Sequence, residues 1–285
     1  MLRERILSSL VLMPLILAIS YLGGIPYLIA VLTVGVLAWA EMARLLQRAN
    51  MVLAPAVGFP IVVGLILETY GYSSGWISDS LLRPLLAGLI VFSLICALYN
   101  RGEHPALEWG ATFGAAIYLG FLLSHFVMLR EFQRPPAQTW WLSIPAGGGR
   151  DPGLNWVVTA LGLTWITDAT AYLVGSSRGR HPLWPRISPK KTWEGLIGGS
   201  VGALIAGAIL GCWLLHLPLW VGIVLGALVA TAAPFGDFAV SLFKRTAHCK
   251  DSGQLIPGHG GILDRLDSLL FVIPAVTYFA CLVAR

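Results

Sequence analysis

The segment from Ser241 to Asp267 brings together three kinds of side chain that phosphate chemistry needs. Its cations can neutralise phosphate groups; they are Lys244, Arg245, Lys250 and Arg265. Its glycines allow backbone N–H groups to turn toward an anion; they are Gly258, Gly260 and Gly261. Asp264 and Asp267 stand three residues apart and would share one face of a helix. Such carboxylates beside phosphate-binding cations suit Mg²⁺, which takes one or two carboxylates together with substrate phosphates.

Aspartates are concentrated in the second half of the chain. Five of the seven lie at or after position 168, namely Asp168, Asp237, Asp251, Asp264 and Asp267. Asp237 precedes Lys244 by seven residues, which would place it about 10 Å inside the end of an apolar helix. A carboxylate at that depth in a membrane is costly and usually functional. A helix–helix hydrogen bond or a structural ion pair is the alternative, above all for Asp168.

A second polar segment, Ser188-Pro189-Lys190-Lys191-Thr192-Trp193-Glu194-Gly195, precedes an apolar run. Alone, it is typical of a basic anchor before a helix, with Ser188 or Thr192 as the N-cap. Because it is predicted to lie on the same side of the membrane as the first segment, phosphate binding is favoured for Ser188, Lys190 and Lys191.

His259 is the histidine best placed for a site, because it stands between two glycines of the first segment. It could donate to a phosphate or stabilise a leaving group. A role in forming the turn is the alternative. The other histidines show no ligand spacing.

Composition indicates a membrane protein. The chain has 285 residues, of which 56% are hydrophobic and 12% charged, with a mean hydropathy of +0.76. Soluble domains carry about twice that share of charge, and disorder requires low hydrophobicity. Four scattered cysteines exclude a disulfide scaffold or a CxxC zinc site. The formal charge of +5 suits anionic lipids or nucleotides, but not nucleic acid, because the cations are divided among loops.

The predicted fold is an all-α, polytopic membrane helix bundle with about nine transmembrane helices and a polar C-terminal cavity open to the cytoplasm. The first apolar run lacks a clear cleavage site, so it is interpreted as a span rather than a signal peptide. The expected spans are residues 6–22, 25–47, 52–70, 81–99, 107–129, 154–174, 195–216, 218–243 and 269–284. The expected divisions are N-terminal helices in 1–75, middle helices with a possible dimer contact in 76–153, and a catalytic domain in 154–285.

The basic residues predict the orientation. With nine spans and a cytoplasmic N-terminus, 14 of the 19 Lys and Arg residues fall inside. We therefore expect the candidate site at the cytoplasmic face of a bacterial inner membrane. Many of these cations belong to that site, so the same residues would serve both membrane orientation and substrate binding.

Small residues recur at four-residue spacing, which lets helices approach closely. The pairs are Gly110 and Gly114, Gly198 and Gly202, Gly207 and Gly211, and Gly222 and Gly226. Packing within one chain is favoured over a dimer contact.

The segment from Ser241 to Asp267 resembles the signature of the phosphatidate cytidylyltransferase (CDP-diacylglycerol synthase) family. That pattern has Ser, an apolar residue two positions on, Lys-Arg, Lys-Asp after four residues, and a final His-Gly-Gly, Asp-Arg and Asp; every fixed position is matched. Ser188 to Gly195 resembles a further motif of the family, and Thr167-Asp168-Ala169 with Tyr172 resembles a third.

The resemblance implies the reaction of CTP with phosphatidate to give CDP-diacylglycerol and pyrophosphate. It also implies Mg²⁺, a second cation (K⁺ or another divalent ion) and a homodimer. We expect catalytic roles for Lys244, Arg245, Lys250, Asp251, His259 and Arg265. We expect substrate binding by Ser188, Lys190, Lys191, Ser241, Gly258, Gly260 and Gly261. The expected metal ligands are Asp237 and Asp264, supported by Asp267 or Asp168.

Other classes of protein remain open at this point. Glycine-interrupted helices with buried aspartates also describe an ion-coupled transporter. A CDP-alcohol phosphotransferase would show a DG…AR…G…D…D spacing, which is absent. A lipid kinase that uses CTP is a weaker alternative.

Overall fold

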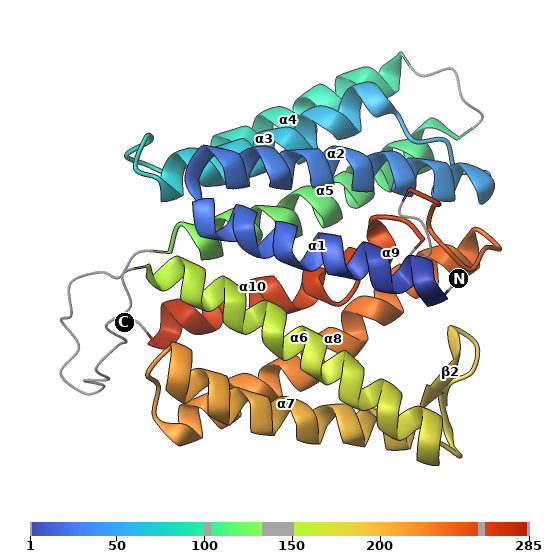
Figure 1. The fold of residues 1–285 in the computed structure, drawn as a ribbon. Coiled ribbons are helices and arrows are strands. Elements are labelled where there is room, and N and C mark those ends of the chain that lie inside the picture. Colours follow the sequence, from blue (N-terminus) through green and yellow to red (C-terminus); the bar gives the residue numbers. More distant parts are fainter. Residues whose placement is uncertain (1, 100–103, 133–150, 256–259, 284–285) are drawn as a thin grey trace. The chain divides into compact units, whose positions relative to one another are not determined.

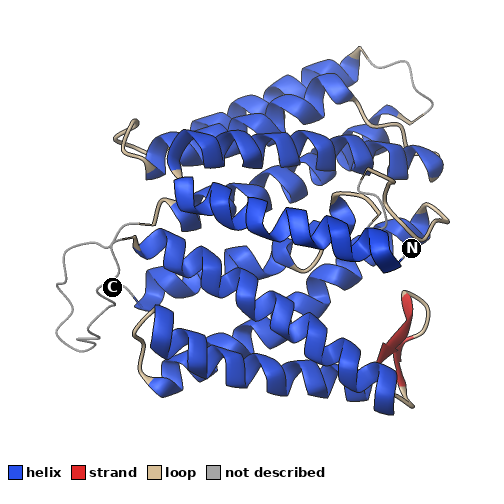
Figure 2. Cartoon of the chain, in the orientation of Figure 1, coloured by secondary structure: helices blue, strands red, loops and turns tan. Residues whose placement is uncertain are grey.

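A computed structural model describes residues 2–99, 104–132, 151–255 and 260–283, with the side chains of the first helix described from residue 10 onward. Helices account for most of the described chain, and one short hairpin accompanies them (Figures 1 and 2). The helices are α1 (Leu2–Leu22), α2 (Gly24–Arg48), α3 (Pro55–Ser73), α4 (Leu82–Leu98), α5 (Pro105–Arg130), α6 (Pro152–Arg178), α7 (Trp193–Leu214), α8 (Leu219–Thr246), α9 (Leu263–Leu266) and α10 (Leu269–Val283). The strands are β1 (Pro182–Trp184) and β2 (Ser188–Thr192).

Each of the nine predicted apolar segments forms a helix. The run expected at 107–129, for example, is the helix Pro105–Arg130, and the run expected at 218–243 is Leu219–Thr246. Helices are favoured because apolar surroundings leave the backbone N–H and C=O groups no partners except one another. The prediction of an all-α membrane protein is confirmed.

Seven helices of the described chain are long and apolar enough to cross a membrane. They are Gly24–Arg48, Pro55–Ser73, Pro105–Arg130, Pro152–Arg178, Trp193–Leu214, Leu219–Thr246 and Leu263–Val283, the last of which combines α9 with α10. Leu10–Leu22 and Leu82–Leu98 are shorter apolar helices. The protein is therefore a multi-pass membrane protein, and the count of nine spans stays a prediction.

The chain divides into two compact units. Unit 1 comprises Met1–Glu131 and Phe243–Arg265, and unit 2 comprises Phe132–Leu242 and Leu266–Arg285. The expected division into 1–75, 76–153 and 154–285 is not tested by these units.

In unit 1, α3 packs against α2, α4 and α5. Gly120 of α5 allows the closest approach, because a Cβ at this position would lie 2.8 Å from the Cα of Val62. Trp39 of α2 is fully buried, and a side chain at Gly58 would overlap its ring. Close helix packing therefore fixes α2, the helix that carries the buried Glu41.

In unit 2, α6 packs along α7 (Figure 1). Gly207 of α7 faces Gly222 and Gly226 of α8, and a Cβ at Gly207 would lie 2.7 Å from the Cα of Gly226. Gly198 and Gly202 similarly face side chains of α6. Packing within one chain is thus confirmed for these glycines.

The glycines of α5 differ from those of unit 2. A Cβ at Gly110 or Gly114 would meet nothing within 4 Å among the described residues. Among the described residues, therefore, no neighbouring helix packs closely against Gly110 or Gly114.

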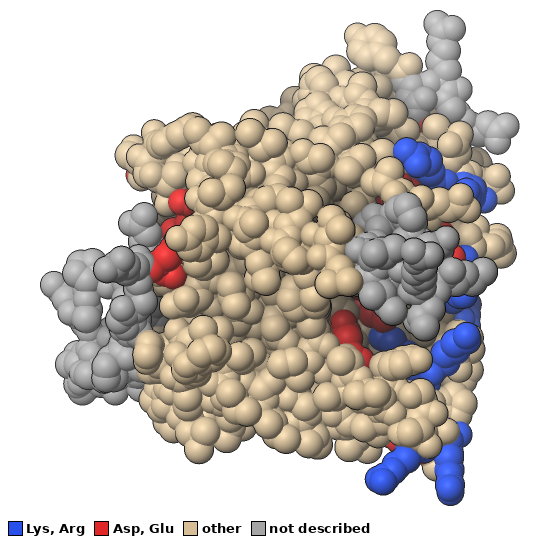
Figure 3. Space-filling view, viewed as in Figure 1, with Lys and Arg blue, Asp and Glu red and all other residues tan. Residues whose placement is uncertain are grey.

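The hairpin β1–β2 was not predicted from the sequence. Its strands are antiparallel, with Pro182 opposite Thr192 and Trp184 opposite Ser188. Thr192 then caps α7, because its Oγ1 accepts a hydrogen bond from the N–H of Gly195 at 3.1 Å. On the face seen in Figure 3, unit 2 is mostly uncharged, and its Lys and Arg atoms gather beside this hairpin.

Candidate active site

A cavity of about 560 Å³ lies in unit 2 between α6, the hairpin, α7 and α8. Five predicted site residues line it, namely Asp168, Ser188, Lys190, Lys191 and Asp237. The remaining lining is largely apolar and includes Leu183, Leu196, Ala230 and Pro234, together with Tyr172. The cavity thus offers charged groups for phosphates and apolar surface for a lipid or a base.

Asp237 of α8 is bound from two directions. Its Oδ2 forms an ion pair with Lys191 Nζ at 2.5 Å, and its Oδ1 accepts a hydrogen bond from Ser241 Oγ at 3.0 Å. Lys191 also lies 4.7 Å above the ring of Phe238, which packs against Trp184 of β1. The ion pair, the cation–π contact and the aromatic contact together attach the hairpin to α8.

Glycines bring α6 and α7 together beside the cavity. A Cβ at Gly195 would lie 2.9 Å from the carbonyl oxygen of Ala171, and a Cβ at Gly199 would lie 3.1 Å from that of Thr167. Larger side chains at these positions would separate the helices. These glycines therefore help to set the distance between α6 and α7, which both line the cavity.

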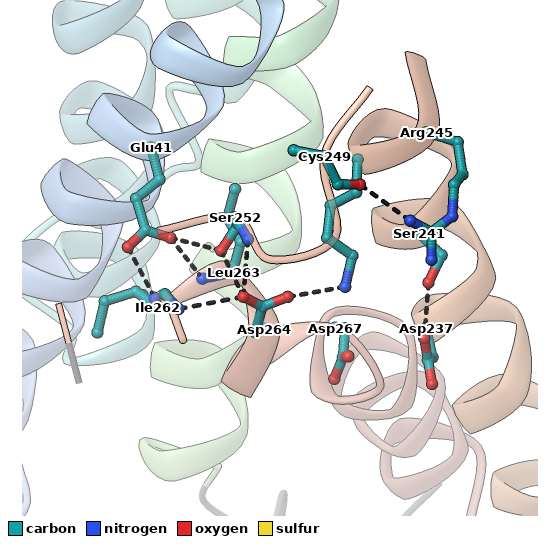
Figure 4. A network of polar contacts seen from close by, with 12 residues as sticks. Glu41, Asp237, Ser241, Arg245, Cys249, Ser252, Ile262, Leu263, Asp264 and Asp267 are labelled. Atoms are coloured by element: carbon teal, nitrogen blue, oxygen red, sulfur yellow. Dashed lines mark hydrogen bonds and ion pairs between the residues drawn. The ribbon is translucent and has the colours of Figure 1, made fainter. Parts of the chain in front are cut away.

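Asp264 is the centre of a polar network in unit 1 (Figure 4). Its Oδ1 accepts from Lys244 Nζ at 2.7 Å. Its Oδ2 accepts from the N–H of Ser252 at 2.8 Å, from Ser252 Oγ at 3.0 Å and from the N–H of Gly261 at 3.1 Å. Lys244 is only 8% exposed, so this charge pair is shielded from water.

Glu41 of α2 joins the same network. Its Oε1 accepts from the N–H of Ile262 at 2.9 Å, and its Oε2 accepts from the N–H of Leu263 at 3.0 Å and from Ser252 Oγ at 2.9 Å. Glu41 is 3% exposed. Two buried carboxylates therefore organise the glycine-containing end of the signature segment.

The other predicted site residues differ in their surroundings. Arg245 donates to the carbonyl oxygen of Cys249 at 2.9 Å (Figure 4), whereas Lys250, Asp251 and Arg265 are exposed. Gly260 has a φ of 82°, a conformation suited to glycine. Asp267 follows α9 in the chain and is half-buried. Gly258 and His259 lie outside the described residues.

Two carboxylates of the cavity are of the chemical type that binds a magnesium ion. The described residues contain no group of three or more His, Cys, Asp or Glu side chains that could hold a metal. Asp168 and Asp237 both line the cavity beside two lysines. Mg²⁺ is usually held by one or two carboxylates with substrate phosphates completing its coordination, so this pair is a suitable partial ligand set.

Comparison with known proteins covers nearly the whole chain. Residues 3–283 match the "Cytidylyltransferase family". The chain is 34% identical over 290 residues to the phosphatidate cytidylyltransferase of Synechocystis sp., covering 98% of this chain and 96% of the relative. It is 30% identical over 282 residues to the phosphatidate cytidylyltransferase of Bacillus subtilis, covering 98% of each. This chain belongs to the cytidylyltransferase family. The matched region includes the helices of both units and is not confined to the signature segment.

Two residues of the network, Glu41 and Ser252, were not predicted from the sequence. Glu41 had a usable signal, because an ionisable residue inside an apolar span is a candidate functional residue. Ser252 had none, since a serine in a polar loop is common. Their contact joins positions 211 residues apart in the sequence.

Proposed function

We propose that this chain transfers the cytidylyl group of CTP to phosphatidate, forming CDP-diacylglycerol and pyrophosphate. The family membership supports this activity, as do the relatives named phosphatidate cytidylyltransferase that match over the full length. An ion-coupled transporter is not favoured by the same comparisons.

The observation that carries the proposal is the cavity of unit 2, where Lys190 and Lys191 line the same space as Asp168 and Asp237. Both substrates are anionic and repel each other. Transfer between phosphates depends mainly on positioning and charge neutralisation. The two lysines would neutralise phosphate oxygens, while the apolar wall would accept part of the lipid.

The chemical step needs no strong general base. A phosphate monoester is largely ionised near neutral pH, because its second pKa is about 6. A phosphatidate oxygen would attack the α-phosphorus of CTP and form the new P–O bond. The bond from that phosphorus to the bridging oxygen of the β-phosphate would break, and pyrophosphate would leave with the electron pair.

Magnesium is the proposed cofactor. Asp168 and Asp237 would hold it in the cavity, and Asp264 and Asp267 stay proposed ligands from the signature segment. When bound, it would neutralise phosphate charge and polarise the phosphoryl group. A second cation, K⁺ or divalent, belongs to the same proposal.

The remaining signature residues keep their proposed roles. Cations would bind the triphosphate and the lipid phosphate; they are Lys244, Arg245, Lys250 and Arg265. Further catalytic roles are proposed for Asp251 and His259. Substrate contacts are proposed for Ser188, Ser241, Gly258, Gly260 and Gly261. Lys244 forms an ion pair with Asp264. In the reaction, Lys244 would either hold the Asp264 carboxylate in place or leave it to bind a substrate phosphate.

We also propose that the N-terminus and the cavity face the cytoplasm of a bacterial inner membrane, and that the protein is a homodimer. The excess of Lys and Arg in the predicted inner segments supports the orientation. Accessibility labelling of single cysteines in intact cells would test the orientation, and light scattering of the detergent complex would test the dimer.

Purified protein in detergent, incubated with phosphatidate, Mg²⁺ and each of four labelled nucleoside triphosphates, tests the activity. The proposal predicts a labelled liponucleotide with CTP. No liponucleotide with any nucleotide, accompanied by solute uptake when the protein is in vesicles, would contradict the proposal and favour a transporter.

A further inference from the structure

Glu41 occupies an unusual position for a charged residue. It lies within the apolar helix Gly24–Arg48, seven residues before its end, and is 3% exposed. Seven residues of helix correspond to about 10 Å. An ionised carboxylate at such depth is costly unless hydrogen-bond donors compensate it. The hydrogen-bond donors that contact Glu41 therefore indicate its role.

Among the described residues, Glu41 accepts hydrogen bonds from three donors, and all three belong to the signature segment. Two are the consecutive N–H groups of Ile262 and Leu263, at 2.9 and 3.0 Å, and the third is the hydroxyl of Ser252, at 2.9 Å. Hydrogen bonds to a carboxylate are stronger than those between neutral groups. They fasten the start of α9 to α2, so the backbone immediately before Asp264 is held by Glu41.

Ser252 links Glu41 directly to Asp264. Its Oγ lies 2.9 Å from Glu41 Oε2 and 3.0 Å from Asp264 Oδ2. A serine hydroxyl has one hydrogen to donate, so the two carboxylates share a single donor. The position of one carboxylate thus depends on that of the other (Figure 4).

Glu41 also accounts for two glycines of the segment. A Cβ at Gly253 would lie 2.7 Å from Glu41 Oε1. A Cβ at Gly261 would overlap both oxygens of Glu41 and the hydroxyl of Ser252. Gly253 and Gly261 therefore leave room for the carboxylate of Glu41, against which their backbone packs.

We infer that Glu41 is a positioning residue for cytidylyl transfer, which fixes Asp264 through Ser252 and the N–H groups of Ile262 and Leu263. The inference rests on the proposed function and adds to it a residue from outside the signature. Because Glu41 accepts hydrogen bonds from the segment that carries Asp264, its removal should affect the turnover number more than the substrate affinity.

Glu41→Gln tests the inference, because it keeps the size of the side chain and removes its charge and one acceptor. The turnover number should fall about 10- to 100-fold, the cost of displacing a catalytic group by about 1 Å. The KM values for CTP and phosphatidate should stay within about threefold. Hydrogen exchange at the amides of Ile262 and Leu263 should accelerate, because their acceptor is weakened.

Glu68→Gln is the matched control. Glu68 is a second buried glutamate of unit 1, 9% exposed, which accepts from Ser80 Oγ at 2.8 Å. This variant should leave turnover and the two amides unchanged. A turnover number of Glu41→Gln within twofold of the wild type, or an equal loss in both variants, would overturn the inference.

Ser252→Ala provides a second route if Glu41→Gln does not fold. It removes the shared hydroxyl and leaves the two amide donors of Glu41 in place. Turnover should fall at least threefold with unchanged KM values, and unchanged turnover would overturn the inference. An inactive wild-type protein would instead contradict the proposed function, so the two failures are distinguishable.

Discussion

Lys191 and Asp237 form an ion pair at 2.5 Å that joins the end of the hairpin to α8. Both side chains line the cavity and both remain partly exposed, at 31% and 26%. Partly exposed pairs contribute little to stability, about 0–1 kcal/mol. We propose that Lys191 exchanges this carboxylate for a substrate phosphate, because breaking such a pair would cost little folding energy.

The lysine pair should control substrate affinity. In the double variant Lys190→Ala/Lys191→Ala, the apparent KM for CTP or for phosphatidate should rise about tenfold, corresponding to the loss of one or two charge-assisted hydrogen bonds. Steady-state kinetics in mixed micelles measure this. Arg186→Ala, an exposed residue of the same loop that does not line the cavity, is the control. Unchanged KM values in the double variant would reduce the lysines to a membrane anchor.

Ser241 should tune the metal affinity of Asp237. Hydrogen bonds to a ligand side chain typically change metal affinity 10- to 100-fold, so Ser241→Ala should raise the Mg²⁺ concentration for half-maximal activity by about tenfold. Asp237→Asn should have a larger effect. Thr231→Ala, an exposed threonine of the same helix, should leave the Mg²⁺ titration unchanged. Identical titrations for all three variants would remove Asp237 from the ligand set.

Asp264→Asn should abolish turnover and also lower the thermal midpoint. Removing one partner of a buried ion pair costs about 3–5 kcal/mol, because the charge of Lys244 is left without its carboxylate. The double variant Lys244→Met/Asp264→Asn removes both charges and should regain stability without regaining activity. If activity returned together with stability, the role of Asp264 would be structural only. Asp79→Asn, at an exposed position of unit 1, is the control.

The crossing of α7 and α8 should tolerate no side chain. Gly226→Ala would push a Cβ into the backbone of Ala203, and overpacking costs about 1–3 kcal/mol. Gly88→Ala in α4 meets nothing within 4 Å, and alanine is the better helix former by about 1 kcal/mol. Thermal unfolding in detergent should therefore show opposite signs for the two variants. Equal effects would contradict the close crossing.

Much of the fold could be predicted because membrane helices have a strong signal. An apolar run of about 20 residues has few alternatives to a helix, and the predicted bounds agree with the helices to within a few residues. The hairpin β1–β2 could not be predicted, since its strands have only three and five residues and β2 carries polar side chains without alternation. Its shape depends on contacts such as Trp184 with Phe238.

The site was predictable in part for a similar reason. Asp168 and Asp237 could be predicted because carboxylates inside apolar runs are costly. Lys190 and Lys191 could be predicted because their segment was expected on the same side of the membrane as the signature segment. The cavity brings the four residues together. The network of Glu41 with Ser252 depends on a contact between a helix and a loop, at residues 211 positions apart. Chemical type alone gives no information on such a pairing.

The position of the label in CTP tests the central claim most directly. Purified protein is incubated with phosphatidate, Mg²⁺ and CTP that carries ³²P at either the α- or the γ-phosphate. Cytidylyl transfer predicts that the α-label enters the lipid product and that the γ-label is released as pyrophosphate. Entry of the γ-label into the lipid would identify a lipid kinase, and no label in lipid from either nucleotide would contradict the account.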